Sequence, residues 1–118
     1  MPKAQRAKGN RGERATATEI REAFVELADD IKRGWQAARG DNAPDIEGVP
    51  GFWIENKTLK KFNTAPLDQA VEASAGKGVI PFAVIRPDRK DPVVMIRWFD
   101  FLGILQDVID GKLEAKNV

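Results

Sequence analysis

The fold is decided between residues 43 and 61, which read APDIEGVPGFWIENKTLKK. Two short runs rich in strand-favouring residues, Asp45–Val49 and Phe52–Asn56, flank the dipeptide Pro50-Gly51. Proline followed by glycine suits the two corner positions of a tight turn, because proline fixes its own φ at a negative value and glycine tolerates a positive φ. The pattern therefore predicts a β-hairpin.

The rest of the chain predicts three helices and two further strands. Apolar residues recur at helical spacing from about 13 to 38, and a second helix is expected over Pro66–Ala75, where Gly76 ends it. The apolar runs GVIPFAVIR (78–86) and PVVMIRWF (92–99) predict strands, and Asp100 can cap a short final helix. The expected architecture is α/β, a sheet of about four to five strands with helices packed on it.

The length of 118 residues fits one domain with a single core. We expect this domain to span 1–118, with a basic arm over 1–12 and a polar tail over 110–118. The first fourteen residues hold five basic side chains and one acidic one, although the whole chain has a net charge of only +1. Such an arm suits a polyanionic partner, and it is equally typical of a solvated terminus.

The composition excludes several kinds of chemistry. The chain has no cysteine, histidine or tyrosine, which rules out disulfides, thiolate or histidine metal sites, Ser-His-Asp triads and cysteine or tyrosine nucleophiles. Any catalysis must use carboxylates, lysine, arginine or a hard cation. No apolar run approaches the ~18 residues that span a bilayer, and the start does not resemble a secretory signal. We therefore expect a cytoplasmic protein of a bacterial, archaeal or phage-infected host cell.

Three chargeable side chains lie around the predicted hairpin. Side chains alternate along a strand, so Glu55 and Lys57 share one face, and the hairpin folds Asp45 back toward Glu55. Paired carboxylates hold Mg²⁺, which lowers the pKa of bound water and polarises a phosphate, and a nearby lysine can orient or deprotonate that water. The trio suits phosphodiester hydrolysis. By itself, this trio is also typical of the solvent-exposed face of an ordinary edge strand.

The segment PDIEGVPGFWIENK resembles the signature of the PD-(D/E)xK nuclease superfamily, with matches at Pro44-Asp45 and Glu55-Asn56-Lys57. Within that superfamily the chain is most similar to archaeal-type and phage-encoded Holliday junction resolvases. These open with a basic, glycine-containing segment that runs into a helix with an early glutamate, as GNRGERATATEI (9–20) does. The resemblance covers roughly residues 9–100 and implies a restriction-endonuclease-like core.

The resemblance also implies roles for individual residues. Asp45 and Glu55 would bind Mg²⁺, with Mn²⁺ as an expected substitute, and Lys57 would serve the attacking water. The backbone carbonyl of Asn56 would add a metal ligand. Glu13 would reach the metal from the first helix, directly or through a bound water.

Two positions fit the family less closely. Gln69 matches a glutamine that many superfamily members place near the active lysine, and it is nearly as typical of a plain exposed helix residue. Residue 56 is a polar Asn where many relatives carry an apolar residue, which indicates a less buried strand end.

The substrate implied by the resemblance is a four-way DNA junction, cut by a homodimer. Phosphate contacts supply most non-specific DNA affinity, so local basic patches must offset the low net charge. The candidate DNA-binding residues are Lys3, Lys8, Arg11, Arg14, Arg33, Arg39, Lys60 and Lys61. A further cluster, Arg86, Arg89 and Lys90, is interpreted as a solvated face.

Two alternatives remain open at this point. One is a related nuclease of the same superfamily that cuts flaps or other branched or duplex DNA. The other is a non-catalytic nucleic-acid-binding module, which the intact trio argues against.

The three tryptophans are interpreted mainly as packing residues. Trp35 and Trp98 are expected in the core, whereas Trp53 shares a face with Glu55 and can pack under the site. The apolar run VVMIRWFDFL (93–102) can cover a subunit interface.

Overall fold

A computed structural model describes residues 3–34, 43–58 and 63–116, with side chains for residues 9–34, 43–58 and 63–111. The elements follow one another along the chain as helix α1 (Lys3–Ala23), a 3-10 turn η1 (Val25–Leu27), strands β1 (Lys32–Arg33), β2 (Ile46–Glu47) and β3 (Phe52–Lys57), helix α2 (Ala65–Ser74), strands β4 (Ile80–Ile85) and β5 (Val93–Ile96), and helix α3 (Trp98–Lys116).

The five strands form one mixed sheet in the order β1-β2-β3-β4-β5. The central pair, β3 and β4, is parallel, and the other three pairs are antiparallel. A parallel pair needs a crossover connection, which α2 provides between β3 and β4. The predicted α/β class and the five-stranded sheet are confirmed, and the arrangement is consistent with a restriction-endonuclease-like core.

The hairpin forms as the sequence predicts. Ile46 of β2 lies opposite Ile54 of β3. At the turn, the Phe52 amide donates to the Val49 carbonyl over 3.3 Å, and Gly51 has a φ of 87°. A positive φ at the second corner of such a turn favours glycine, which explains the Pro-Gly pair.

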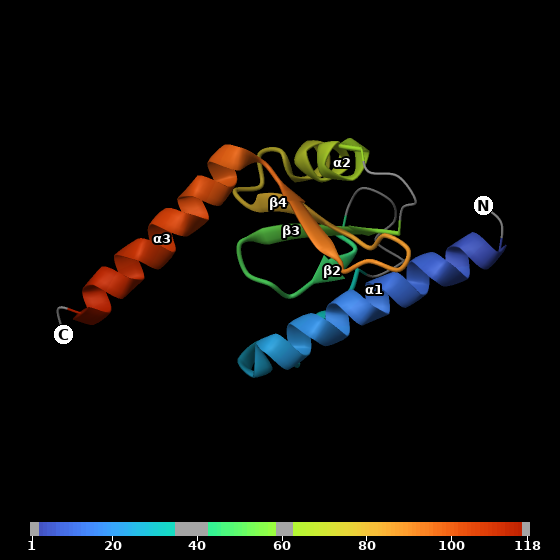
Figure 1. The fold of residues 1–118 in the computed structure, drawn as a ribbon, viewed down its shortest axis with the longest axis horizontal. Coiled ribbons are helices and arrows are strands. Elements are labelled where there is room, and N and C mark those ends of the chain that lie inside the picture. The colour runs from blue at the N-terminus through green and yellow to red at the C-terminus, as the bar shows by residue number, and fades with distance from the viewer. Residues whose placement is uncertain (1–2, 35–42, 59–62, 117–118) are drawn as a thin grey trace.

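Helices cover the two faces of the sheet, α1 on one side and α2 on the other (Figure 1). The main apolar cluster lies beneath α1, where Ala17 packs with Ile31, Ile46 and Ile54. On the α2 side, Ala70 is fully buried over the central strands. Alternate residues of β3 therefore enter two different environments, one beneath each helix.

The long helix predicted over about 13 to 38 is wrong at both ends. Helix α1 begins at Lys3 and ends at Ala23, after which the chain turns through η1 into the edge strand β1. Ile31 still enters the core, but it does so from the segment that leads into β1. The Arg21 guanidinium fixes this segment with hydrogen bonds of 3.0 and 2.7 Å to the Ile31 carbonyl. Pairing with β2 thus overrides the helical spacing of the apolar residues.

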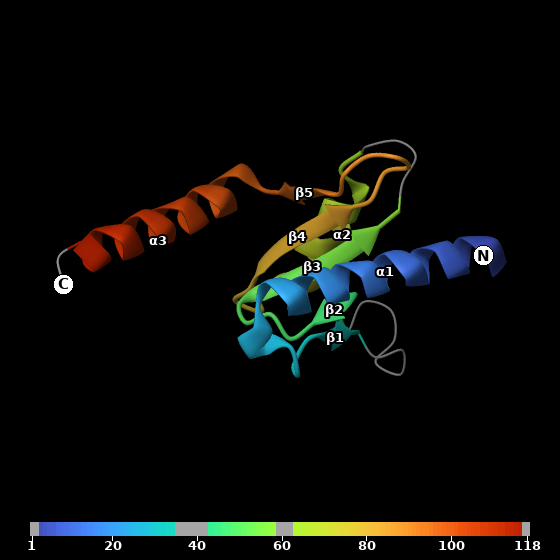
Figure 2. The ribbon, with the colours of Figure 1, turned by 60° about the horizontal axis from the view of Figure 1, so that its bottom comes forward.

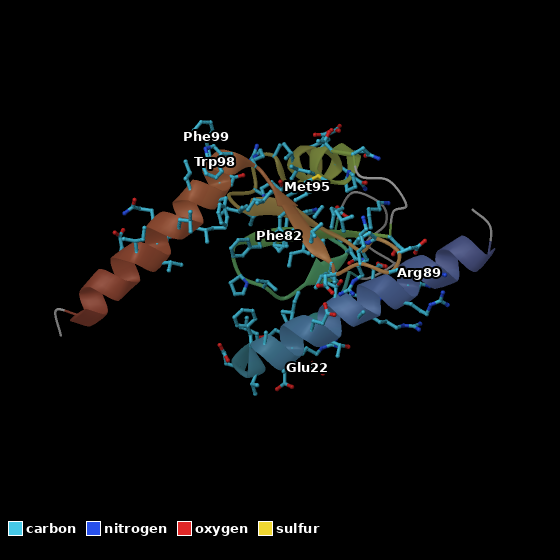
Figure 3. All side chains as sticks on the ribbon, in the orientation of Figure 1. Glu22, Phe82, Arg89, Met95, Trp98 and Phe99 are labelled. Atoms are coloured by element: carbon cyan, nitrogen blue, oxygen red, sulfur yellow. The ribbon has the colours of Figure 1, made fainter. Side chains whose placement is uncertain are left out.

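The C-terminal region also differs from expectation. Helix α3 is nineteen residues long, where a short helix was predicted, and it extends away from the sheet and the other helices (Figure 2). Trp98 was expected in a strand within the core, but it begins α3 and is 61% exposed. Figure 3 shows Trp98 and Phe99 projecting from the start of this helix. In the described part of the chain, no helix is long and apolar enough to cross a membrane.

Candidate active site

The two predicted carboxylates meet at one end of the hairpin. The regular β2–β3 register is observed for Ile46 and Ile54, and Asp45 directly precedes Ile46. The backbone amide of Asp45 donates to the Ile54 carbonyl over 3.0 Å, one residue out of that register, so regular pairing ends at Ile46. The Asp45 and Glu55 carboxyl groups nevertheless lie together and share a hydrogen bond.

Glu55 is buried, with only 4% of its surface exposed. The Trp53 indole lies on the same face and donates a hydrogen bond of 3.0 Å from Nε1 to Glu55 Oε1. Burial, the hydrogen bond with Asp45 and the Asp45 charge raise the pKa of Glu55 to about 8, and the Trp53 hydrogen bond and Lys57 partly oppose this rise. The expectation that Trp53 shares a face with Glu55 is confirmed by this contact.

Lys57 and the Asn56 backbone lie at the same end of β3. Lys57 is exposed and occupies the last position of the strand, two residues after Glu55 and on the same face. The Asn56 amide donates to Asp45 Oδ2 over 2.9 Å. The N–H and C=O of one strand residue point to the same edge, so the Asn56 carbonyl also faces the Asp45 side.

Glu13 approaches from α1. Its carboxylate lies 3.5 Å from the Arg33 guanidinium, which also donates a hydrogen bond of 2.8 Å to Asn10. Burial, followed by the Asp45 charge, raises the pKa of Glu13, and Arg33 and Lys57 act in the opposite direction. The charges of Asp45 and Lys57 therefore affect the pKa of Glu13, while its ion-pair partner is Arg33.

The chemistry of these groups fits a divalent cation. Two carboxyl groups that share a hydrogen bond in a buried place cannot both be ionised without a balancing charge, and the raised pKa of Glu55 reflects this. A hard cation with oxygen ligands would supply that charge. Within the described residues no three Asp or Glu side chains are grouped closely enough to hold one ion. The donor set that fits is Asp45, Glu55 and the Asn56 carbonyl, completed by water.

The remaining predicted residues lie in several places. Gln69 is exposed on α2, the helix that covers the Glu55 face of the sheet. Arg11 and Arg14 are exposed on α1, and Arg33 is half-buried beside Glu13. Lys3 and Lys8 belong to α1, and their side chains lie outside the described set. Arg39, Lys60, Lys61 and Trp35 lie outside the described residues.

Two expectations about polar residues near the site are wrong. Asn56 is buried, with 6% of its surface exposed, because the Thr16 hydroxyl donates to its Oδ1 over 2.5 Å. Arg86 is not part of a solvated face. Its Nε donates to Thr16 over 2.9 Å and its guanidinium forms an ion pair with Glu19. Arg89, by contrast, is exposed, as expected.

Sequence reasoning missed Thr16 and its hydrogen bonds with Asn56 and Arg86. A polar residue inside an otherwise apolar strand, FWIENK, was the available signal. Thr16 and Glu19 lie three residues apart on α1, and a pair of polar side chains at this spacing is what a buried polar strand residue requires opposite it.

No protein-family model matches the chain, and no curated protein is similar to it in sequence. Among solved structures, the chain is similar to Hjc, a Holliday junction resolvase from the archaeal hyperthermophile Archaeoglobus fulgidus. The TM-score is 0.42 and the sequence identity is 22%, over 64% of this chain and 71% of that chain. The resemblance is a distant one.

Proposed function

We propose that the protein is a Mg²⁺-dependent, structure-specific DNA endonuclease that acts as a Holliday junction resolvase. The observation that carries the proposal is the position of the Asp45 carboxylate at the end of β3, where it accepts a hydrogen bond from the Asn56 amide, between Glu55 and Lys57 in the strand. The absence of histidine, cysteine and tyrosine leaves few other routes to hydrolysis, and this trio provides one of them.

The proposed mechanism assigns one task to each group. Mg²⁺ would supply Lewis-acid chemistry, polarising the scissile phosphate and lowering the pKa of water. Asp45 and Glu55 hold the ion, and the Asn56 amide orients the Asp45 carboxylate through its 2.9 Å hydrogen bond. Trp53 fixes one oxygen of Glu55, which leaves the other oxygen available to the ion. Lys57, exposed beside them, orients the attacking water and offsets charge that develops on the phosphate.

The proposed substrate is branched DNA, recognised by shape and backbone charge. Arg11 and Arg14 are exposed on the helix that carries Glu13, and they are proposed to contact the DNA backbone. Contacts of this kind fix the position of a duplex without reading its sequence. A net charge of +1 means that such local groups must supply the affinity.

The protein is proposed to act as a homodimer that joins through α3. Phe101, Leu102, Leu105, Val108 and Ile109 form an exposed apolar stripe on this helix. At its root lies an open apolar hollow of about 490 Å³, lined by Phe52, Phe82, Val94, Ile96, Phe101 and Ile104. The stripe and the hollow are both apolar and share Phe101. In the proposed two-fold arrangement, the stripe of each copy packs into the hollow of the other. A polyanion such as DNA would instead require positive charge on this face.

The test is a cleavage assay on labelled four-way junctions, flaps and linear duplex, with Mg²⁺ or EDTA, alongside the Asp45→Asn variant. Paired symmetric cuts in the junction, lost with EDTA and in the variant, are the expected result. Cutting of flaps or of all branched forms would identify a related nuclease with another substrate. Binding without cleavage at any Mg²⁺ concentration would overturn the enzymatic proposal and favour a non-catalytic binding module.

A further inference from the structure

A buried polar cluster joins α1 to the ends of β3 and β4. It consists of Thr16 on α1, Asn56 on β3 and Arg86 directly after β4, and we refer to these three residues as the α1 clamp. Thr16 is 3% exposed and Asn56 is 6% exposed, so the cluster lies inside the protein. Buried polar groups of this kind require partners, and the partners here come from three separate elements.

The hydrogen bonds of the clamp run in one direction. Arg86 Nε donates to Thr16 Oγ1 over 2.9 Å, and the Thr16 hydroxyl donates in turn to Asn56 Oδ1 over 2.5 Å. A hydroxyl has one proton to donate and lone pairs to accept with, so Thr16 can make both bonds at once. Glu19, on the same helix, holds the other end of the Arg86 guanidinium in an ion pair.

Each clamp residue is also hydrogen-bonded to, or adjacent on its helix to, a residue of the proposed active site. The backbone amide of Asn56 donates to Asp45 Oδ2, and the backbone amide of Arg86 donates to the Lys57 carbonyl over 2.8 Å. Thr16 follows Glu13 by three residues, which places the two on neighbouring positions of one helix turn. The clamp thus connects α1 to the backbone around Asp45 and Lys57.

Gly12 shows how closely the helix approaches the strand end. A Cβ atom at this position would lie 2.9 Å from Thr58 Oγ1 and 3.0 Å from Asn56 Nδ2. Within the described structure these two atoms are buried without a hydrogen-bond partner. Leaving Asn56 Nδ2 unpaired costs stability that an apolar residue at position 56 would avoid. The close contact therefore serves something other than stability alone.

We propose that Thr16, Asn56 and Arg86 are positioning residues that hold Glu13 in register with Asp45 and Lys57. The inference rests on the proposed nuclease function, because the groups it positions are those assigned to hydrolysis. Loss of the Thr16 hydroxyl leaves Arg86 Nε and Asn56 Oδ1 without their shared partner, and α1 then loses its fixed contact with the end of β3. Small displacements of reacting groups are costly, with losses of about 100-fold for a shift of about 1 Å.

The experiment compares wild type with Thr16→Val, which keeps the shape but removes the hydroxyl, and with Thr16→Ser, which restores the hydroxyl. Thr18→Val is the matched control, since Thr18 is exposed on the same helix. Cleavage of a four-way junction is measured at saturating Mg²⁺ to separate kcat from KM. The backbone amide signals of Asn56 and Lys57 are recorded by NMR without metal or DNA.

Thr16→Val should lower kcat by about 10- to 100-fold with little change in KM, and it should shift the two amide signals. Thr16→Ser should recover most of the activity, and Thr18→Val should match wild type. Glu13→Gln should cost far less in the Thr16→Val background than in wild type, because a displaced Glu13 has little left to lose.

The proposal is overturned if Thr16→Val retains wild-type kcat, or if the serine variant is as impaired as the valine variant. Should Thr16→Val fail to fold, Arg86→Lys keeps a cation beside Glu19 but loses the Nε bond to Thr16, and it should show the same loss of kcat with unchanged KM. Full activity of that variant would overturn the proposal. If the wild-type protein cuts no DNA, the proposed nuclease function is wrong. If the wild type is active and Thr16→Val is equally active, only the positioning role is wrong.

Discussion

Two regions of this molecule, the end of β3 and the start of α3, depart from the usual distribution in which apolar side chains are buried and polar ones are exposed. At the end of β3, polar Asn56 and Glu55 are buried, with 6% and 4% of their surfaces exposed. At the start of α3, Phe99 is 82% exposed and Trp98 is 61% exposed. Buried polar groups and exposed apolar groups are the informative exceptions in a globular domain. Each exception lies where the proposed function requires a partner, a cation at the end of β3 and a second copy of the chain at α3.

The two regions differ in the kind of partner that is proposed for each. Glu55 and Asp45 share a hydrogen bond, and the proposed partner there is a divalent cation, which requires a small number of oxygen ligands at defined distances. The apolar stripe of α3 needs a large surface of no particular charge, which a second copy of the chain would supply. The candidate site at the end of β3 should therefore be sensitive to the loss of single polar atoms. Helix α3 should instead be sensitive to the amount of apolar area that it can bury.

The largest effect is expected at Lys57. Lys57→Ala should lower the rate of junction cleavage by about 100- to 10,000-fold, because the ammonium is proposed to orient the attacking water and to offset the phosphate charge in the transition state. Binding of Mg²⁺, measured by calorimetry without DNA, should not weaken, because Lys57 is not among the proposed ligands. Lys90→Ala, which removes an exposed lysine from the β4–β5 turn, is the control. Equal activity of Lys57→Ala and Lys90→Ala would contradict the assigned role.

A second prediction concerns Glu55 and pH. The folded protein binds the Glu55 proton more tightly than the unfolded chain does, because the folded pKa is about 8 and the ordinary value is 4.5. Without metal, the free energy of unfolding of wild type should therefore fall as pH rises between these two values, and then level off. Glu55→Gln keeps an acceptor for Trp53, gains a donor toward Asp45 and carries no charge.

This variant should therefore be more stable than wild type above pH 8 in EDTA, by on the order of 2 kcal/mol, and nearly equal to it near pH 4. Urea unfolding at several pH values measures the difference. Glu13 has a raised pKa as well, so Glu13→Gln should show a change in the same direction. Mg²⁺ should stabilise wild type and leave Glu55→Gln almost unchanged. A stability difference that does not depend on pH would contradict the buried, protonated state of Glu55.

The third prediction concerns the apolar stripe of helix α3. Leu105→Glu places a charge in the apolar stripe of α3 and should weaken self-association by about 10- to 100-fold, which corresponds to the loss of about 1.5–3 kcal/mol for one buried leucine. Gln106→Glu adds the same charge one residue away and should leave the dimer intact. Light scattering over a concentration series measures the oligomeric state. A monomeric wild type would contradict the dimer and leave α3 to another partner.

The sequence predicts the hairpin well and the helices less well, for a physical reason. The hairpin depends on local chemistry, since Pro50-Gly51 sets the turn and the register follows from it. The turn brings the Asp45 carboxylate to Glu55 and to the Asn56 amide, so the main residues of the candidate site lie within thirteen positions of the sequence, 45 to 57. The end of α1 is decided instead by pairing between β1 and β2, which involves residues far apart in the chain. Periodicity alone could not show that the chain would turn at Phe24.

The environment of Asn56 and Trp98 was missed for related reasons. Asn56 looked exposed because its partner, Thr16, lies forty positions earlier in the chain on another element. Trp98 looked buried because an apolar run adjoining a strand is normally covered by the same chain. In this protein the run continues into α3, and its apolar surface faces outward.

The smallest expected effect belongs to the exposed arginines of α1, and it separates DNA binding from catalysis. Arg11→Ala and Arg14→Ala should each weaken junction binding a few-fold and reduce the slope of log affinity against log salt by about 1, because each side chain is proposed to neutralise one phosphate. Arg89→Ala removes an equally exposed arginine from the β4–β5 turn, outside α1, and should change neither quantity. Fluorescence anisotropy in Ca²⁺, which occupies oxygen sites, would measure binding with catalysis suppressed. If all three variants shift the slope equally, the DNA contacts extend beyond α1 to the β4–β5 turn.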